Sequence, residues 1–228
     1  MSLTLFDLDG TLISGDSDLL WTRFLADHGV IGEEACADAA SLGRRYAGAT
    51  VVPDDYCNFH AALLGGMSKA QLLPLRQRFL AQVVRPLVPD AARALVQRHR
   101  DAGDRLLLTT ATNRVVSELT AQDLGIAEHL CTELEWDGDI CTGRVSGTPN
   151  LRMGKVARLR AWLDAQGLHD AELKRATFYS DSFNDLALLS MVGRPVVVDP
   201  DARLEAVALR RDWQVLRLRL PRRVALPA

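Results

Sequence analysis

Two aspartates, Asp7 and Asp9, follow an apolar run at the start of the chain and stand directly before Gly10. Residues i and i+2 of an extended chain share a face, so both carboxylates can point into one site while Leu8 points the opposite way. Gly10 interrupts the apolar run, which predicts a buried strand that ends near Asp7. The spacing therefore favours two carboxylates held together at the end of a strand.

A second acidic pair, Asp181 and Asp185, follows the apolar stretch 176–181. Ligands of open α/β sheets bind outside the carboxyl ends of the strands, so both acidic pairs should converge on one crevice. Two unit charges ~4 Å apart repel by roughly 4 kcal/mol at an effective dielectric constant near 20. A cation or protons must relieve such a cluster. Oxygen ligands of this kind suit Mg²⁺, which commonly meets a substrate phosphate.

Alternating strands and helices surround these acidic residues. The apolar runs and their breakers predict strands over 2–8, 105–110, 176–181 and 195–199, and helices over 90–102, 115–124, 154–166 and 186–191. Asp90 is the expected N-cap of one helix, and Gly103 and Gly125 each end another. A further helix and the segment 213–220 close the chain, and the alternation of Leu and Arg in the tail 216–228 suggests an edge strand. This alternation predicts a parallel sheet.

Residues 17–85 have a helical pattern throughout and lie between the first predicted strand and the second. The block therefore interrupts one α/β domain. We predict a core domain formed by 1–14 and 86–228 and an inserted helical domain over 15–85. Its aromatic residues have the spacing of packing residues, so we assign them no chemical role.

Asp137-Gly138 predicts a tight hairpin turn within 132–145. A two-residue turn there pairs Trp136 with Asp139, Leu134 with Cys141 and Cys131 with Arg144. Cys131 and Cys141 would then face opposite sides of the hairpin, which excludes a disulfide between them. The cysteines also lack the paired spacing of a zinc site.

The composition excludes several classes of function. The net charge is −2 and the 25% charged residues mix both signs, so no strong positive field favours nucleic acid or acidic lipid. The start of the chain lacks a signal-peptide pattern, and no apolar run approaches the ~20 residues of a membrane helix. We expect a cytoplasmic protein with no nucleic-acid or membrane partner. The sequence leaves the oligomeric state open.

Four motifs in order give the chain a resemblance to a known family. DxDGT occupies 7–11, Thr110 closes the apolar strand in LLLTTATN, Lys155 lies in MGKVARL, and Asp181 and Asp185 lie in SDSFNDLALL. The chain resembles phosphatases of the haloacid dehalogenase (HAD) superfamily, subfamily IB, which carry a C1-type helical cap after the first strand. The resemblance covers nearly the whole length and implies an α/β, Rossmann-like three-layer core with a parallel sheet.

The resemblance implies Mg²⁺-dependent hydrolysis of a small phosphate monoester. Asp7 would attack phosphorus and form an aspartyl-phosphate, and Asp9 would act as general acid and then as general base. Thr110 and Lys155 would neutralise charge on the phosphoryl group. The implied metal ligands are Asp7 and Asp181 by side chain and Asp9 by its backbone carbonyl, with Asp185 holding Lys155 or a metal-bound water.

The substrate prediction depends on the residues just after the first motif. Phosphoserine phosphatases place a Glu nine residues after the nucleophile to receive the substrate amino group, and Asp16 stands there in this chain. The stretches SGDSDLLW, TATNR and SGTPN resemble bacterial histidinol-phosphate phosphatases. We therefore expect an amino-bearing ester, with histidinol phosphate ahead of phosphoserine. Candidate substrate contacts are Thr11, Asp16, Asp18 and Ala111, and either Asp16 or Asp18 can instead cap a helix.

Two other functions share part of this chemistry. A phosphotransferase of the mutase type would use Asp7 but return the phosphoryl group to a sugar, and a product assay distinguishes it. A receiver module also groups a phosphorylatable Asp with acids, a Thr and a Lys. Receiver modules are shorter, carry that Asp in mid-chain and have no helical insertion.

Overall fold

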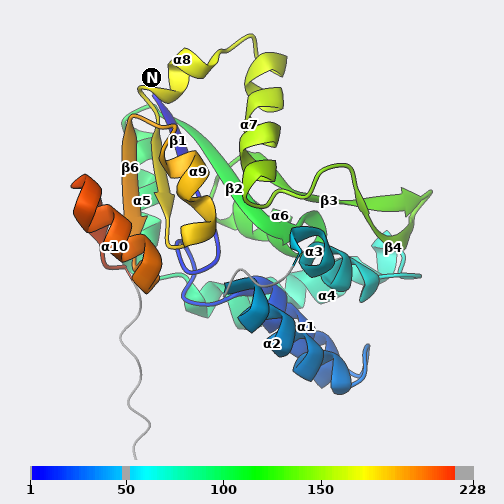
Figure 1. The fold of residues 1–228 in the computed structure, drawn as a ribbon. Helices are drawn as coiled ribbons and strands as arrows, with labels where there is room; N and C mark the ends of the chain where they lie inside the picture. The colour runs from blue at the N-terminus through cyan, green and yellow to red at the C-terminus, as the bar shows by residue number, and fades with distance from the viewer. Residues whose placement is uncertain (1, 48–51, 219–228) are drawn as a thin grey trace, which may run out of the picture.

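The structure, a computed structural model, describes residues 2–47 and 52–218 (Figure 1). Its described part contains a seven-stranded sheet in the order β4-β3-β2-β1-β5-β6-β7. The strands are β1 (Leu3–Phe6), β2 (Arg105–Asn113), β3 (Glu128–Asp137), β4 (Ile140–Ser146), β5 (Thr177–Ser180), β6 (Arg194–Val198) and β7 (Gln214–Leu216). Neighbouring strands are parallel except β3 and β4. β1 is central, and the strand order reverses beside it, which is where ligands bind in such sheets.

Helices cover both faces of this sheet. One face carries α5 (Asp90–Asp101) and α6 (Arg114–Asp123), and the other carries α7 (Met153–Ala165), α9 (Leu186–Leu189) and α10 (Ala202–Arg211). Alternate strand residues explain the two layers, because Leu108 and Tyr179 pack on the first face whereas Leu107 and Phe178 pack on the second. The predicted three-layer α/β fold is confirmed. A short helix, α8 (Asp170–Leu173), was not predicted.

The segment between β1 and α5 is helical, as its pattern indicates. It contains α1 (Ser17–Asp27), α2 (Glu34–Ala47), α3 (Pro53–Ala62), α4 (Lys69–Phe79) and two short turns of helix, η1 (Leu80–Val84) and η2 (Arg85–Leu87). Trp21 packs on Phe24 and Phe79 with ring centroids 5.6 and 5.0 Å away. These rings are buried and continuous with the core under α5 and α6, so α1 and α4 are anchored to the sheet domain. The division into two domains remains a prediction.

The hairpin departs from the predicted register. The paired residues are Asp137 with Ile140 and Trp136 with Cys141. Gly138 and Asp139 are therefore the central turn residues, and the positive φ of 57° falls on Gly138. Glycine at the first central position is the pattern of a type II′ turn, whereas the predicted turn centred on Asp137-Gly138. All four cysteines are free, so Cys131 and Cys141 form no disulfide.

Three other local predictions need correction. Asp90 is the first residue of α5, and the N-cap is Pro89, which makes no side-chain hydrogen bond. Proline is well suited to the start of a helix. β2 runs on to Asn113, whose side chain accepts a hydrogen bond from Val116 N and caps α6. β3 begins at Glu128 as a parallel partner of β2 before it enters the hairpin.

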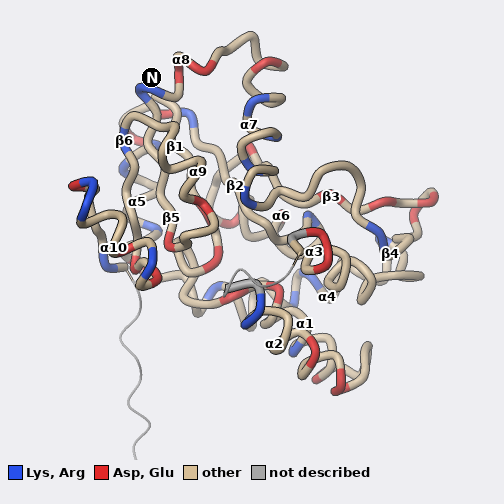
Figure 2. The backbone as a smooth tube through the Cα atoms, viewed as in Figure 1, with Lys and Arg blue, Asp and Glu red and all other residues tan. Residues whose placement is uncertain are grey.

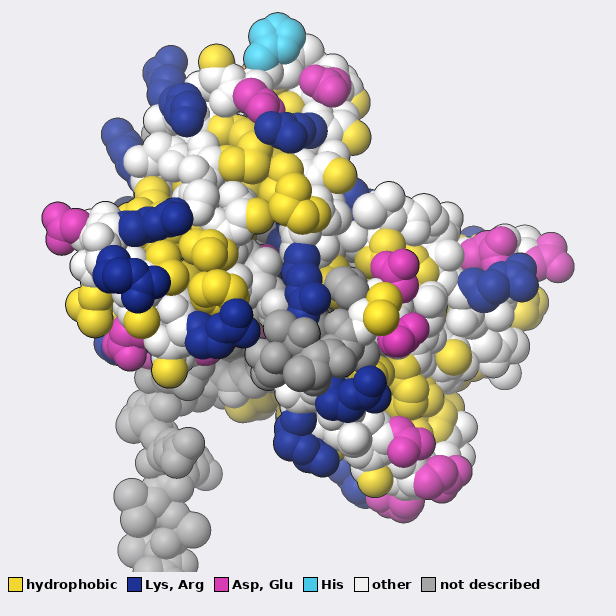
Figure 3. Space-filling view, viewed as in Figure 1, with side chains coloured by type: hydrophobic (Ala, Val, Ile, Leu, Met, Phe, Trp, Pro, Cys, Tyr) yellow, Lys and Arg dark blue, Asp and Glu magenta, His cyan; other side chains and the backbone are white. Residues whose placement is uncertain are grey.

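The closing segment 213–220 contains an edge strand, β7 (Gln214–Leu216). The tail 216–228, for which an edge strand was expected, lies outside the described residues from 219 onward. On the face shown in Figure 3, basic, acidic and apolar side chains are interspersed. None of the described helices has the length and apolar character needed to cross a membrane.

Candidate active site

The two acidic pairs meet in one crevice of about 720 Å³ at the carboxyl ends of β1, β2 and β5. Figure 2 shows acidic positions from distant parts of the chain gathered between the end of β5 and the start of α1. The predicted site residues that line the crevice are Asp7, Asp9, Asp16, Asp18, Thr110, Ala111, Lys155, Asp181 and Asp185. The strand ends therefore assemble the acidic residues as their positions in the chain predict.

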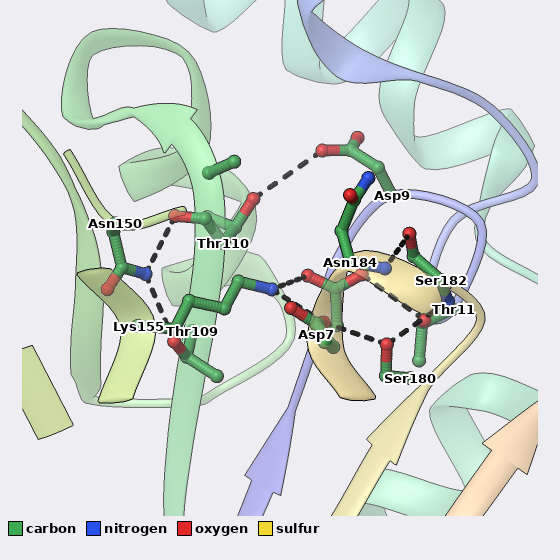
Figure 4. A network of polar contacts seen from close by, with 12 residues as sticks. Asp7, Asp9, Thr11, Thr109, Thr110, Asn150, Lys155, Ser180, Ser182 and Asn184 are labelled. Carbon is green, nitrogen blue, oxygen red and sulfur yellow. Dashed lines mark hydrogen bonds and ion pairs between the residues drawn. The ribbon is translucent and has the colours of Figure 1, made fainter. Parts of the chain in front are cut away.

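Lys155 lies in the first turn of α7 and is 3% exposed. Its Nζ donates to Asp7 Oδ1 and to Asp185 Oδ2, each at 2.7 Å (Figure 4). Ser180 Oγ also donates to Asp185 Oδ2 at 2.8 Å. Burial opposes the ammonium charge, yet the two carboxylates hold the pKa of Lys155 above its ordinary value. Lys155 is therefore a charged bridge between the first and the last motif.

Asp7 and Asp181 lie on either side of one hydroxyl. Thr11 Oγ1 is 3.4 Å from Asp7 Oδ2 and 3.4 Å from Asp181 Oδ1, and it accepts from Asp181 N at 3.1 Å. Burial raises the pKa of Asp7 to about 7, although Lys155 opposes the rise. Burial and then the charge of Asp7 raise the pKa of Asp181 well above its ordinary range. Thr11 itself lies behind these carboxylates and does not line the crevice.

Gly10 is required by the close approach of Asp181. Its φ is +72°, and a Cβ at this position would stand 2.0 Å from Asp181 Oδ2. A side chain would therefore both strain the backbone and displace the carboxylate. Glycine in the first motif lets the loop after β1 pass directly under the loop after β5.

The donor set at this end of the crevice fits Mg²⁺. Thr11 has one proton for the two carboxylates of Asp7 and Asp181, and Lys155 is shared between Asp7 and Asp185. No group of three His, Cys, Asp or Glu side chains within the described ranges is arranged to hold a metal by itself. Mg²⁺ needs only one or two carboxylates, because it keeps several waters and takes oxygens from a substrate phosphate. Asp7 and Asp181 can supply those two carboxylates.

Asp9 lies on the opposite wall from Lys155. Its Oδ1 accepts from the backbone N of Ser17 at 2.6 Å, and its Oδ2 accepts from Thr112 Oγ1 at 2.8 Å and Thr110 Oγ1 at 3.5 Å. The pKa of Asp9 is raised to about 7, mainly by burial and to a smaller extent by the negative charges of Asp16 and Asp18. Sequence reasoning missed Thr112, although its position two residues beyond Thr110 on an extended strand could have indicated it.

Asp16 and Asp18 have different surroundings. Asp16 is the N-cap of α1, because its Oδ1 accepts from Leu19 N at 3.0 Å. Asp18 lies inside the first turn of α1 and is 3% exposed. Burial raises the pKa of Asp16 to about 6 and that of Asp18 to about 7. Capping is therefore observed for Asp16 and not for Asp18.

A buried amide fixes the end of β2. Asn150 Nδ2 lies 3.0 Å from Thr109 Oγ1, 2.9 Å from Thr110 O and 3.0 Å from Leu130 O (Figure 4). Thr109 is thereby turned away from the crevice, and Thr110 lines it. Sequence reasoning missed Asn150, because a polar residue in a loop distant in sequence gives no local signal.

Comparison with known proteins identifies the family. The family model of haloacid dehalogenase-like hydrolases matches residues 4–190 of this chain. A histidinol-phosphatase of Neisseria meningitidis serogroup C (strain 8013) is 38% identical over 217 residues, which cover 94% of this chain and 98% of that protein. A phosphoserine phosphatase of Mycobacterium tuberculosis (strain ATCC 25618 / H37Rv) is 33% identical over 238 residues, which cover 96% and 72% respectively. The chain belongs to the haloacid dehalogenase-like hydrolase family and is a phosphatase.

Solved structures share the fold. A protein of unknown function from Bordetella pertussis Tohama I is 37% identical and has a TM-score of 0.88, with 95% of this chain and 98% of that chain covered. A phospho-aspartyl intermediate analogue of phosphoserine phosphatase has a TM-score of 0.68 at 13% identity, with 96% and 93% covered. At that identity the likeness shows the fold alone.

Proposed function

We propose that this phosphatase hydrolyses a small, amino-bearing phosphate monoester in a Mg²⁺-dependent reaction through an aspartyl-phosphate on Asp7. The observation that carries the proposal is that Asp7 lines the crevice with Lys155 Nζ 2.7 Å from its Oδ1. A carboxylate and a phosphate are both anionic, so attack requires positive charge at this point. Lys155 supplies one charge, and Mg²⁺ held by Asp7 and Asp181 would supply the rest when bound.

Asp7 is the proposed nucleophile. One carboxylate oxygen attacks phosphorus, the bond from phosphorus to the ester oxygen breaks, and the phosphoryl group is transferred to Asp7. Lys155 orients the carboxylate by hydrogen bonding to Oδ1. Asp185 in turn holds Lys155 in place, because it accepts from the same ammonium group at 2.7 Å.

Asp9 is the proposed general acid and base. Its protonated carboxyl gives a proton to the leaving alkoxide, and its carboxylate then takes a proton from the water that attacks the aspartyl-phosphate. A pKa of about 7 suits both steps near neutral pH, since the group is populated in both forms. Thr110 and Thr112 hold Asp9 Oδ2, and Ser17 N holds Oδ1.

The remaining assignments concern the helical segment and the substrate. We propose that residues 15–85 form a cap over the core, because Asp16, Asp18, Gly43 and Tyr56 from this segment line the same crevice as the motif residues. Relatives named histidinol-phosphatase and phosphoserine phosphatase support histidinol phosphate first and phosphoserine second. The cytoplasmic location remains a prediction.

Phosphate release from a panel of esters tests this function. The panel holds histidinol phosphate, phosphoserine and sugar phosphates, each assayed with Mg²⁺ and after chelation. We expect release from the amino-bearing esters that chelation abolishes and Mg²⁺ restores. Equal release from every ester would contradict the substrate class, and undiminished turnover after chelation would contradict the metal requirement. Transfer of the phosphoryl group from an ester to a sugar, without release of free phosphate, would favour the mutase-type alternative.

A further inference from the structure

Arg152 has an unusual backbone conformation for a bulky residue. Its φ is 51° and its ψ is −119°, and Gly154 N donates to Leu151 O at 2.8 Å across it. These are the features of a type II′ turn, whose first central position favours glycine because φ is positive there. A β-carbon at this position strains the backbone, and such strain tends to be kept where a functional site needs the residue.

The side chain of Arg152 reaches the loop that follows β5. Its Nε donates to Asn184 Oδ1 at 3.0 Å. Asn184 lies in the short helix η3 (Phe183–Asp185) and lines the crevice, whereas Arg152 is not one of the lining residues. Because Arg152 occupies the oxygen of the Asn184 amide from outside the crevice, the amide nitrogen Nδ2 is left as a donor on the inner side.

The backbone of Asn184 is held independently of Arg152. Asn184 N donates to Ser182 Oγ at 3.2 Å (Figure 4), and Phe183 N donates to Asp201 Oδ2 at 2.6 Å. The contact from Arg152 therefore acts on the orientation of the Asn184 side chain rather than on the path of the loop.

Asn184 stands at the end of the crevice where the phosphoryl group would bind. It precedes Asp185, which shares Lys155 with the proposed nucleophile Asp7. We infer that Arg152 is a positioning residue, which holds the amide of Asn184 so that Nδ2 donates to a phosphoryl oxygen of the substrate. This inference rests on the proposed phosphatase function. A glycine would form the same turn without strain, but it could not reach Asn184.

Two substitutions separate the side chain of Arg152 from its backbone strain. Arg152→Gly and Arg152→Ala both remove the guanidinium, but only glycine suits a positive φ. We expect both to lower kcat by about 10- to 30-fold on the ester that wild type hydrolyses best, with Mg²⁺ present. In urea, Arg152→Gly should unfold at a higher midpoint than Arg152→Ala, and at no lower a midpoint than wild type. A structural contact alone would not combine retained stability with lost turnover.

A double-variant comparison tests whether Arg152 acts through Asn184. Asn184→Ala should lower kcat at least as much as Arg152→Ala does. Adding Arg152→Ala to Asn184→Ala should change kcat by less than about twofold, because the two residues form one unit. A further 10- to 30-fold loss in the double variant would overturn the inference, since Arg152 would then act independently of Asn184.

Asp212→Gly is the matched control. Asp212 ends α10 with a φ of 53° and does not line the crevice, so this variant should keep the wild-type kcat. Undiminished kcat in Arg152→Gly, or a midpoint for Arg152→Gly below that of Arg152→Ala, would overturn the inference. Wild-type enzyme that releases phosphate from no ester would overturn the proposed function itself. Active wild-type enzyme with equally active Arg152 variants would overturn only the role of Arg152.

Discussion

The two walls of the crevice contain the same residue type in opposite electrostatic situations. On one wall, Asp7 and Asp185 share Lys155 at 2.7 Å each. On the other wall, Asp9 and Asp18 accept hydrogen bonds from hydroxyl and backbone N–H groups and have no ion pair within the described part of the chain. Lys155 therefore offsets part of the carboxylate charge of the first wall. The second wall has a charge that a ligand can balance.

The difference suits the distinct tasks proposed for Asp7 and Asp9. Burial raises the pKa of both Asp7 and Asp9 to about 7, but Lys155 counteracts the rise at Asp7, and neighbouring carboxylates add to it at Asp9. A carboxylate that must stay ionised to attack benefits from a lysine. A carboxyl that must exchange a proton benefits when no lysine lies beside it.

The largest effect should come from removing the proposed nucleophile. Asp7→Asn should lower phosphate release by about four orders of magnitude or more, because an amide cannot form the acyl phosphate. Circular dichroism and thermal unfolding should show that the fold is retained. Undiminished turnover would contradict the assignment of Asp7.

Removing the cation of the first wall should damage both activity and stability. Lys155→Met should lower kcat by about 100- to 1000-fold and the free energy of unfolding by about 3–5 kcal/mol, because two buried carboxylates lose their partner. Lys69→Met is a matched control, since Lys69 pairs with Asp139 on the surface, where an ion pair contributes about 0–1 kcal/mol. Equal effects of the two substitutions in urea unfolding would show that Lys155 is not a buried bridge.

Asp18 on the second wall should make the stability of the protein depend on pH. Because the pKa of Asp18 is raised to about 7 in the folded state, ionisation of Asp18 is unfavourable for folding. The penalty is absent below the unfolded pKa near 3.8, and it is complete above about pH 7. Asp18→Asn should therefore gain stability relative to wild type as pH rises from 4 to 8. The gain is about 1.4 kcal/mol per unit of pKa shift.

Urea unfolding without metal or substrate measures this gain. Asp27→Asn serves as the comparison, because the pKa of exposed Asp27 is lowered by its hydrogen bond from Arg23. Asp27→Asn should not become more stabilising as pH rises. A difference between Asp18→Asn and wild type that is constant from pH 4 to 8 would show that Asp18 is not desolvated.

The smallest effect is expected at Thr112. Thr112→Val removes the hydroxyl that holds Asp9 Oδ2 and should lower kcat by about tenfold, with little change in KM. Thr112→Ser keeps the hydroxyl and should recover most of the activity, which separates hydrogen bonding from packing. A valine variant as active as the serine variant would show that Asp9 needs no such support.

The sequence alone determined much of the first wall. The apolar runs before Asp7 and Asp181 predict strand ends, and parallel strands bring their carboxyl ends to one edge, so the meeting of the acidic pairs follows from local pattern and sheet topology. The order of strands and helices is predictable for the same reason. The register of the hairpin is not predictable from local pattern, because the pairing across the turn decides which residue takes the positive φ. In the structure that residue is Gly138.

Only the tertiary structure decided the surroundings of the second wall. Asp16 and Asp18 look alike in the sequence, since both stand at the start of a predicted helix. Their separation into a helix cap and a buried carboxylate with an unpartnered oxygen depends on burial against other elements. Thr112 and Asn150 gain their roles in the same way. Local pattern specifies backbone geometry, whereas desolvation and hydrogen-bond partners arise from residues far apart in the chain.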